Sequence, residues 1–297
     1  MRDPKLAKPV VTIDFHVTSE CNQECPYCWG PQGFEHPVDK DTAFKIIERI
    51  KQVGARRIVF TGGDPLKRTD IGSLIRHANE IGLEVALSTT GDELKANFLR
   101  RHASFIDLIS LPLDGASEEI NARTKKAGHF AAIMKALDLL RKYPEIDLKL
   151  CTPVTRHNIG DVPNIVRLAE NYARRTKARV FYNIFQAFPR SMISRQWDEL
   201  LVSDKEFSTL KSELASRKQI PIHFLDHETL DWLYVMIFPD GSLVIPSGSN
   251  FPGYGSFLEI EDLEAVIVSS QFDAAKHRRH SRGWRKAKEK GERIKEK

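Results

Sequence analysis

Strand-like and helix-like segments alternate from residue 10 to residue 188, and this alternation constrains the fold more than any other feature of the chain. The strand-like segments carry apolar residues at alternate positions or in short continuous runs. They span residues 10–18, 55–63, 83–91, 106–114, 146–155 and 178–188. Segments with apolar residues at helical spacing lie between them, at residues 41–53, 71–82, 93–102, 129–142 and 162–174.

Such alternation predicts a mainly parallel sheet covered by helices, because each helix carries the chain back to the start of the next strand. The crossovers are right-handed, so the sheet curls in one direction. Six units are too few for a full eight-unit barrel. We therefore predict an α/β fold in which residues 10–188 form a partial (β/α)6 TIM-type barrel.

The remaining residues do not supply two further units clearly, and we predict that residues 189–275 form a C-terminal α+β extension covering the mouth of the barrel. Its expected elements are a helix at 204–217, a strand at 220–225, a hairpin at 233–246 and a short helix at 261–268. Asp240 and Gly241 suit the hairpin turn. Residues 247–256 are rich in Gly, Ser and Pro, which is typical of a loop.

The net charge of +5 is unevenly distributed. Residues 276–297 contain 11 Lys and Arg and three Glu, a net +8, so the other 275 residues sum to about −3. We predict a basic, flexible tail over these residues. A solvated helix is the favoured interpretation, and binding of an acidic partner or nucleic acid is the alternative. Trp284 is the only aromatic residue of the tail, which argues against a surface for stacking bases.

Nothing in the sequence resembles a membrane span or an export signal. The longest apolar runs, such as residues 108–112 and 263–268, are far shorter than the roughly 20 residues that a span needs. The first residues are charged and lead directly into a strand-like segment. We therefore expect a cytoplasmic protein without a membrane partner.

Three of the four cysteines fall within eight residues, and this cluster indicates metal binding. Cys21, Cys25 and Cys28 have C-x3-C-x2-C spacing just after the first predicted strand, whereas Cys151 is distant. A disulfide framework would need pairs and an oxidising compartment. Three thiolates can bind three irons of a [4Fe–4S] cluster and leave the fourth iron open. A structural zinc site or an electron-transfer cluster would need a fourth ligand.

The cysteine motif, with Tyr27 before the third cysteine, and the sequence TGGDP at residues 61–65 resemble the radical S-adenosylmethionine (SAM) superfamily. The resemblance covers residues 10–188; Asp64 stands where the family usually has Glu. It implies a [4Fe–4S] cluster on the three cysteines, with SAM as second cofactor. Reductive cleavage of SAM then gives a 5′-deoxyadenosyl radical that abstracts hydrogen from a substrate. It also implies an electron donor of the flavodoxin or ferredoxin type.

The resemblance also implies a set of SAM contacts at the ends of the predicted strands. These are Tyr27, Gly62, Gly63, Asp64, Thr90, Ser110, Asp114, Arg123 and Arg156. Tyr27 is expected at the adenine, the two glycines at the amino group, and Arg123 at the carboxylate, where its planar fork suits two oxygens. Arg156 is expected either to contact SAM or to cap the following helix.

Further residues near the predicted barrel mouth have open roles. Lys149, Arg156, Arg190 and Arg195 are candidates for holding an acidic substrate, for contacting SAM, or for ordinary surface charge. Cys151 is expected to be a small buried side chain within a strand. The alternative is a pocket thiol that donates hydrogen to a product radical.

No cysteine follows Cys151, so the sequence has no ligands for a second iron–sulfur cluster. This favours a small-molecule substrate, preferably a nucleotide or sugar. Residues 201–214, 257–266 and 269–288 resemble in their order the C-terminal part of viperin-like enzymes, which dehydrate CTP or other nucleoside triphosphates. Lys149 matches a substrate-phosphate lysine of those enzymes, whereas Cys151 replaces their Asn. Two alternatives remain: modification of a peptide or protein side chain, and a non-catalytic iron–sulfur sensor or scaffold.

Overall fold

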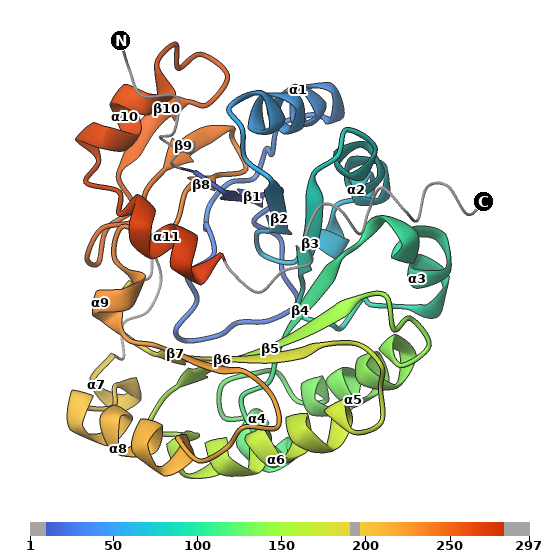
Figure 1. Cartoon of the computed structure of the whole chain (residues 1–297), viewed down its shortest axis with the longest axis vertical. Helices are drawn as coiled ribbons and strands as arrows, with labels where there is room; N and C mark the ends of the chain where they lie inside the picture. The colour runs from blue at the N-terminus through green and yellow to red at the C-terminus, as the bar shows by residue number, and fades with distance from the viewer. Residues whose placement is uncertain (1–9, 191–196, 282–297) are drawn as a thin grey trace.

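A curved sheet organises the chain, which is described by a computed structural model over residues 10–190 and 197–281 (Figure 1). The strand order is β10-β9-β8-β1-β2-β3-β4-β5-β6-β7. The predicted barrel supplies β1 (Thr12–His16), β2 (Arg57–Thr61), β3 (Glu84–Ser88), β4 (Leu108–Pro112), β5 (Asp147–Val154) and β6 (Val180–Gln186). Each of these strands pairs in parallel with the next, which confirms the partial-barrel prediction.

Helices cover the convex side of this sheet (Figure 1). They are α1 (Lys40–Gln52), α2 (Ile71–Glu80), α3 (Ala96–His102), α4 (Glu118–Asn121), α5 (His129–Leu140), α6 (Val162–Ala173) and, after β6, α7 (Trp197–Leu200) and α8 (Asp204–Leu214). Within the described ranges, no helix is both long enough and apolar enough to cross a membrane.

Helix α1 illustrates how the sequence sets these elements. The Asp39 side chain accepts a hydrogen bond from the Thr42 amide at 2.7 Å and so caps the first turn. Ile46, Ile47 and Ile50 recur at helical spacing and are fully buried against the sheet. Gly54, with φ of 88°, ends the segment in a left-handed conformation that glycine adopts without strain.

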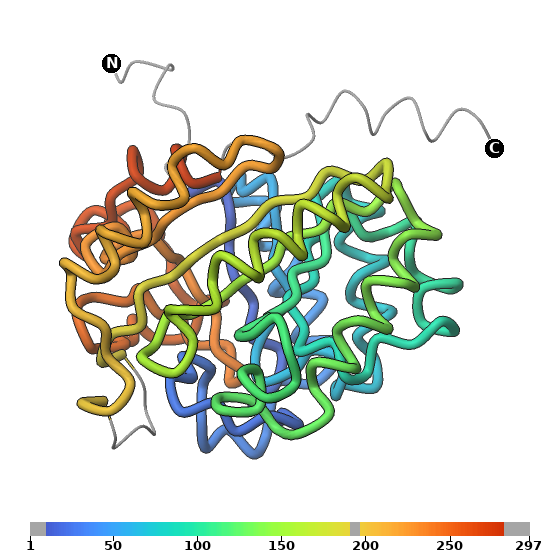
Figure 2. The backbone as a smooth tube through the Cα atoms, turned by 90° about the horizontal axis from the view of Figure 1, so that it is seen from below, coloured from blue at the N-terminus to red at the C-terminus, as the bar shows by residue number. Residues whose placement is uncertain are grey.

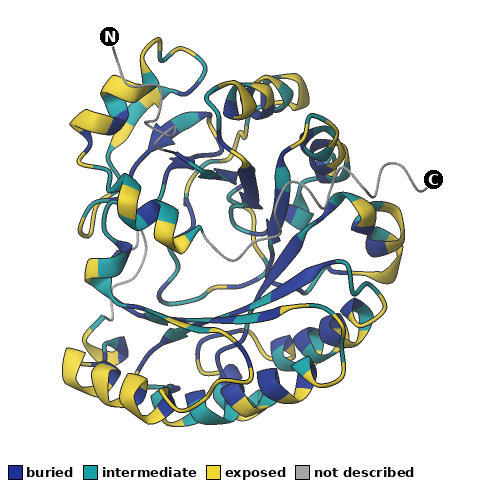
Figure 3. Cartoon of the chain, viewed as in Figure 1, coloured by how far each residue is buried: buried dark blue, intermediate teal, exposed yellow. Residues whose placement is uncertain are grey.

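The two faces of the strands differ in chemistry. On β1, Ile13 and Phe15 are fully buried in the core under the helices, as Figure 3 shows for the sheet in general. Asp14 and His16 alternate with them and therefore face the concave interior. The same alternation brings further polar side chains to that interior. They are Ser110 on β4, Lys149 and Cys151 on β5, and Asn183 on β6.

The C-terminal extension adds strands to both edges of the sheet, which the sequence analysis did not predict. Strand β7 (Ile222–Leu225) pairs in parallel with β6, and β8 (Met236–Ile237) pairs in parallel with β1. Strand β9 (Ser242–Val244) then forms the expected hairpin with β8. Strand β7 lies at the end of the order, so the sheet stays open.

Two segments of the extension correct the prediction. Strand β10 (Gly253–Ser256) pairs with β9 inside the Gly-, Ser- and Pro-rich segment that was expected to be a loop. Helix α11 (Ala274–His280) includes the first residues of the expected basic tail; residues 282–297 lie outside the described residues. The remaining helices are α9 (His227–Leu230) and α10 (Leu263–Ser269).

Helix α11 closes the base of the partial barrel. His277 is buried, and its Nε2 atom accepts hydrogen bonds from the amides of Val11 and Thr12 at 3.0 and 3.1 Å. Its Nδ1 atom donates to the Leu233 carbonyl at 2.8 Å. Figure 2 shows α11, in red, at the opposite edge of the molecule from the blue loop that follows β1.

Candidate active site

The three clustered cysteines lie on the loop after β1, at the carboxyl end of the parallel strands. A hydrogen-bond donor is directed at each sulfur. The Gln23 amide donates to Cys21 at 3.3 Å, and the Gly30 amide donates to Cys28 at 3.3 Å. Lys125 Nζ donates to Cys25 at 3.0 Å. Such donors would orient the sulfurs towards a bound metal and stabilise its thiolate ligands.

The TGGDP turn holds this cysteine loop in place. A Cβ atom added to Gly62 would lie 2.2 Å from the Thr18 carbonyl oxygen, and one added to Gly63 would lie 2.1 Å from that of Glu20. The amides of Gly63 and Asp64 donate to the same two carbonyls at 2.8 and 2.7 Å. Because glycine has no side chain, the turn packs directly on the loop at these two positions. The contact of Gly62 and Gly63 with SAM stays a prediction.

Asp64 is fully buried and joins the ends of β2 and β3. Its carboxylate accepts hydrogen bonds from the hydroxyls of Thr89 at 2.7 Å and Thr90 at 2.6 Å, and from the Leu66 amide at 3.1 Å. Burial raises the pKa of Asp64, and the threonine hydroxyls oppose that shift. Both oxygens accept hydrogen bonds from the protein, so Asp64 fixes the end of β2 against the end of β3, and its contact with SAM stays a prediction.

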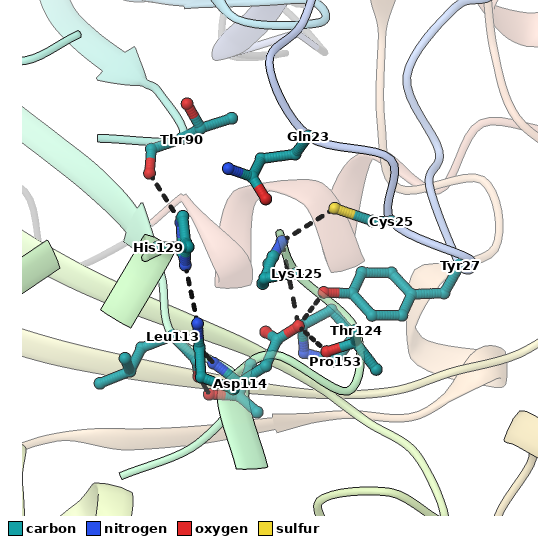
Figure 4. Close-up of polar contacts among 12 residues, drawn as sticks. Gln23, Cys25, Tyr27, Thr90, Leu113, Asp114, Thr124, Lys125, His129 and Pro153 are labelled. Carbon is teal, nitrogen blue, oxygen red and sulfur yellow. Dashed lines mark hydrogen bonds and ion pairs between the residues drawn. The ribbon is translucent and has the colours of Figure 1, made fainter. Parts of the chain in front are cut away.

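Lys125 lies at the centre of a second buried group, between the cysteine loop and β4 (Figure 4). Its ammonium is 3.9 Å from the Asp114 carboxylate and 5.3 Å from the centre of the Tyr27 ring. The Tyr27 hydroxyl and, at 2.6 Å, the Thr124 hydroxyl donate to Asp114. The other Asp114 oxygen is buried without a hydrogen-bond partner in the structure. Burial and the neighbouring carboxylate raise the pKa of Tyr27, so its hydroxyl keeps its proton.

His129 links this group to the end of β3 (Figure 4). Its Nε2 atom donates to the Thr90 carbonyl at 3.0 Å, which leaves Nδ1 to accept from the Asn121 amide group at 3.0 Å. Asn121 in turn accepts from the Asp114 amide at 3.0 Å. Burial lowers the pKa of His129 and keeps the ring neutral. The sequence analysis missed His129, Asn121 and Lys125, although all three lie within six residues of Arg123.

Arg123 and Arg156, which were candidates for contacting SAM, bond to other protein groups. Arg123 is exposed and bonds to the Glu119 carboxylate at 3.0 Å and the His157 carbonyl at 3.4 Å. The Arg156 Nε atom donates to the Leu201 carbonyl at 2.7 Å, on the C-terminal extension. Ser110 is buried, with its hydroxyl 3.3 Å from the Cys151 sulfur. The structure therefore brings Tyr27, Asp64, Thr90 and Asp114 to the cysteine loop, but not Arg123 or Arg156.

The other basic residues considered for the barrel mouth lie in different environments. Lys149 faces the barrel interior, where its positive charge lowers the pKa values of Asp14 and His223. His223 Nδ1 lies 3.2 Å from the side-chain oxygen of Asn183. Arg190 is fully buried and pairs with protein groups, so it does not line an open mouth. Arg195 lies outside the described residues. Cys151 is only partly buried, which differs from the small buried side chain expected for it.

The interior around Asp14 disfavours a charged carboxylate. Burial raises the pKa of Asp14 to about 7 although Lys149 and Arg57 lower it. His16, two residues further along β1, is buried, and neither of its ring nitrogens has a hydrogen-bond partner in the structure. Unpartnered polar groups on the concave face are suited to receiving a polar ligand.

The cysteine loop fits a [4Fe–4S] cluster by its donor set. All three thiols are free, and each already has a hydrogen-bond donor. Partial burial of its sulfur raises the pKa of Cys21 to about 11 although the residue as a whole is exposed, and burial also raises the pKa of Cys28, so binding iron would displace protons from these sulfurs. In the described ranges, no three His, Cys, Asp or Glu side chains form a group for one metal ion. A cluster differs, because each thiolate binds its own iron.

Known proteins resemble this chain over most of its length. The sequence model of the Radical SAM superfamily matches residues 15–169. An S-adenosylmethionine-dependent nucleotide dehydratase from Flammeovirga pacifica is 26% identical over 270 residues, covering 84% of this chain and 88% of that protein. The mycofactocin maturase MftC of Mycobacterium ulcerans is 29% identical, over 54% of this chain and 45% of that protein.

Solved structures share the fold at low sequence identity. The crystal structure of Streptococcus suis SuiB bound to S-adenosylmethionine superposes with a TM-score of 0.67 and 12% identity. The match covers 90% of this chain and 67% of SuiB. Native anSMEcpe with bound AdoMet and the Kp18Cys peptide superposes with a TM-score of 0.66 and 14% identity, over 91% of this chain and 82% of that one.

Proposed function

This chain belongs to the radical SAM superfamily, and we propose that it cleaves SAM reductively and modifies a small molecule, preferably a nucleotide. Cys21, Cys25 and Cys28 would hold the [4Fe–4S] cluster. When bound, that cluster supplies one electron to SAM, which separates into methionine and a 5′-deoxyadenosyl radical that takes hydrogen from the substrate. The observation that carries the proposal is the set of three free thiols, each with a hydrogen-bond donor, at the carboxyl end of the parallel strands.

We assign the cation for the SAM carboxylate to Lys125 in place of Arg123. Lys125 is buried beside the cysteine loop, whereas Arg123 bonds to Glu119 at the surface. A buried ammonium attracts a carboxylate more strongly than an exposed guanidinium, because water screens it less. Asp114 and Tyr27 would orient Lys125, and Asp64 would orient the turn at residues 62–63.

The substrate would enter the concave interior from the cysteine side. Lys149, His223 and Asn183 offer polar groups on β5, β7 and β6, and Asp14 and His16 offer them on β1. A cation with hydrogen-bonding neighbours suits a phosphate-bearing ligand. The nucleotide preference draws support from the dehydratase, because that match extends over most of both chains. Electrons would come from a protein of the flavodoxin or ferredoxin type.

The experiment follows 5′-deoxyadenosine by chromatography in the full chain, purified without oxygen, supplied with iron and sulfide, and reduced with dithionite in the presence of SAM. We expect a brown protein that forms 5′-deoxyadenosine, and loss of product in Cys21→Ala, Cys25→Ala and Cys28→Ala. Cys151→Ala is the matched control, because it removes a thiol outside the loop and should retain iron.

The substrate class is tested by adding CTP, UTP, GTP or ATP to the same assay. A nucleotide that raises 5′-deoxyadenosine formation and is itself converted supports the proposal. One of the relatives, the PqqA peptide cyclase, is named for peptide chemistry. Conversion of a peptide, with no response to any nucleotide, would mean that the substrate is a peptide and not a nucleotide. Bound iron without 5′-deoxyadenosine would indicate a sensor or scaffold.

A further inference from the structure

Arg190 is a fully buried arginine at the junction of three segments. It follows β6, and its guanidinium is held by the C-terminal extension. It forms an ion pair with the Asp231 carboxylate and donates to the carbonyls of Gly248 at 2.5 Å and Leu230 at 3.4 Å. A buried charge requires such compensation. These bonds turn the donors of Arg190 towards the protein and away from any ligand.

The same guanidinium lies over two aromatic rings. Its carbon atom is 4.8 Å from the centre of the Trp29 ring and 4.6 Å from that of Phe188. Trp29 also meets Phe188 edge to face at 5.5 Å and Tyr234 at 6.0 Å. An arginine guanidinium makes cation–π contacts with such rings that a compact lysine ammonium on a flexible stem does not reproduce.

Trp29 lies directly between the third cysteine and the donor to its sulfur. Cys28 precedes it, and the Gly30 amide that follows donates to the Cys28 sulfur. The turn has little free space, because a Cβ atom added to Gly30 would lie 3.0 Å from the Gly62 oxygen and 3.3 Å from the Cys28 sulfur. A displacement of the Trp29 backbone would therefore move both Cys28 and its donor.

We propose that Arg190 is a positioning residue that holds Trp29, and through it residues 28–30, in the geometry needed for iron binding. Asp231 and Gly248 fix the guanidinium, so the C-terminal extension determines the position of the third cysteine. The proposal rests on the cluster-binding role proposed for Cys28. It replaces the three roles that the sequence left open for Arg190, which were holding an acidic substrate, contacting SAM, and ordinary surface charge.

A purely structural role for Arg190 would predict only a loss of overall stability in its variants. Arg57 provides a matched control, since it is 4% exposed and bonds to Glu84 at 2.6 and 3.0 Å at the other end of the barrel. Arg57→Met and Arg190→Met both remove a buried arginine from an ion pair. Arg190→Lys keeps the charge and removes the planar contact with the rings.

The test measures the reaction of each cysteine with iodoacetamide in the full chain prepared without iron, by mass spectrometry of its peptides. Exposed Cys21 serves as the internal reference. We expect Arg190→Met and Arg190→Lys to speed alkylation of Cys28 relative to Cys21 by about fivefold or more, because local opening of residues 28–30 becomes more frequent. Arg57→Met should leave the ratio unchanged even where it lowers the melting temperature equally.

A double variant isolates the route through Trp29. If Arg190 acts on Cys28 through that ring, Trp29→Leu combined with Arg190→Met should add little to either change alone. Equal Cys28 reactivity in Arg57→Met and Arg190→Met, or fully additive effects in the double variant, would overturn the proposal. A wild-type chain that binds no iron would contradict the proposed function, and the alkylation ratios would still decide whether Arg190 positions Cys28.

Discussion

The ammonium of Lys125 lies 3.0 Å from the sulfur of Cys25 and 3.9 Å from the carboxylate of Asp114. One buried cation thus joins a proposed iron ligand to the end of β4. Burial alone would lower the pKa of Lys125, but the surrounding acidic groups, Asp114 foremost, raise it well above its usual value, so the side chain remains charged. The charge is available for a third anionic partner, such as the carboxylate of SAM.

Lys125→Met should reduce the initial rate of 5′-deoxyadenosine formation about tenfold to a hundredfold, since a hydrogen bond to a charged group contributes about 1.5–3 kcal/mol. Lys126→Met is the control, because that neighbouring lysine pairs with Glu24 at the surface. SAM affinity, measured by equilibrium dialysis on the iron-loaded protein, should fall only in Lys125→Met. A loss of affinity in Arg123→Met instead would restore the assignment made from the sequence.

Tyr27→Phe should lower the free energy of unfolding by about 1–3 kcal/mol, because it leaves the buried Asp114 carboxylate with one donor fewer. Urea unfolding followed by circular dichroism measures the difference. Tyr254→Phe, on strand β10 and only partly buried, should cost less than about 0.5 kcal/mol. Equal losses in both variants would mean that the Tyr27 hydroxyl does not stabilise Asp114.

Asp14→Asn should stabilise the protein at pH 8 more than at pH 4. The pKa of Asp14 is raised to about 7 by burial, so between its unfolded and folded pKa values the native state binds more protons than the unfolded state, and stability falls as pH rises. The amide removes this cost, which amounts to about a few kcal/mol at most. Urea unfolding at both pH values gives the difference; a pH-independent difference would contradict the raised pKa.

His277→Ala should destabilise the protein at pH 7.5 by about 1–3 kcal/mol, since the amides of Val11 and Thr12 lose their acceptor. Burial lowers the pKa of His277 to about 4. Its contribution is complete above the unfolded pKa near 6.5 and is lost as the pH falls towards 4. The gap between wild type and variant should therefore narrow at pH 5, as measured by thermal unfolding. A constant gap would argue against a neutral His277.

The repeating part of the fold was predictable because each strand and helix carries its own local pattern. The predicted helix at 162–174 became α6 at Val162–Ala173, and the predicted strands enclose β1 to β6. Strand β8 has only Met236 and Ile237, too few residues for a periodicity, so its pairing with β1 depends on tertiary contacts. Strand β10 likewise pairs through its backbone in a glycine-rich segment.

The site was predictable where chemistry requires particular residue types at fixed spacing, as for Cys21, Cys25 and Cys28. The site was less predictable where the direction of a side chain determines whether the residue reaches the cysteine loop. Arg123 and Lys125 are two residues apart, and only the turn after α4 sends the first to the surface and the second to the cysteine loop. The spacing of residues in the sequence does not predict the direction of side chains in such a turn.

The pairing of β1 with β8, and the closure of its base by His277, join the beginning and end of the described chain. During synthesis, the strand that leads into the cysteine loop leaves the ribosome more than 200 residues before the partners that cover its free edge. Contacts this distant in sequence slow folding and leave that edge open to aggregation meanwhile. Iron delivered before the last helix has docked would therefore meet a cysteine loop attached to an unfinished sheet.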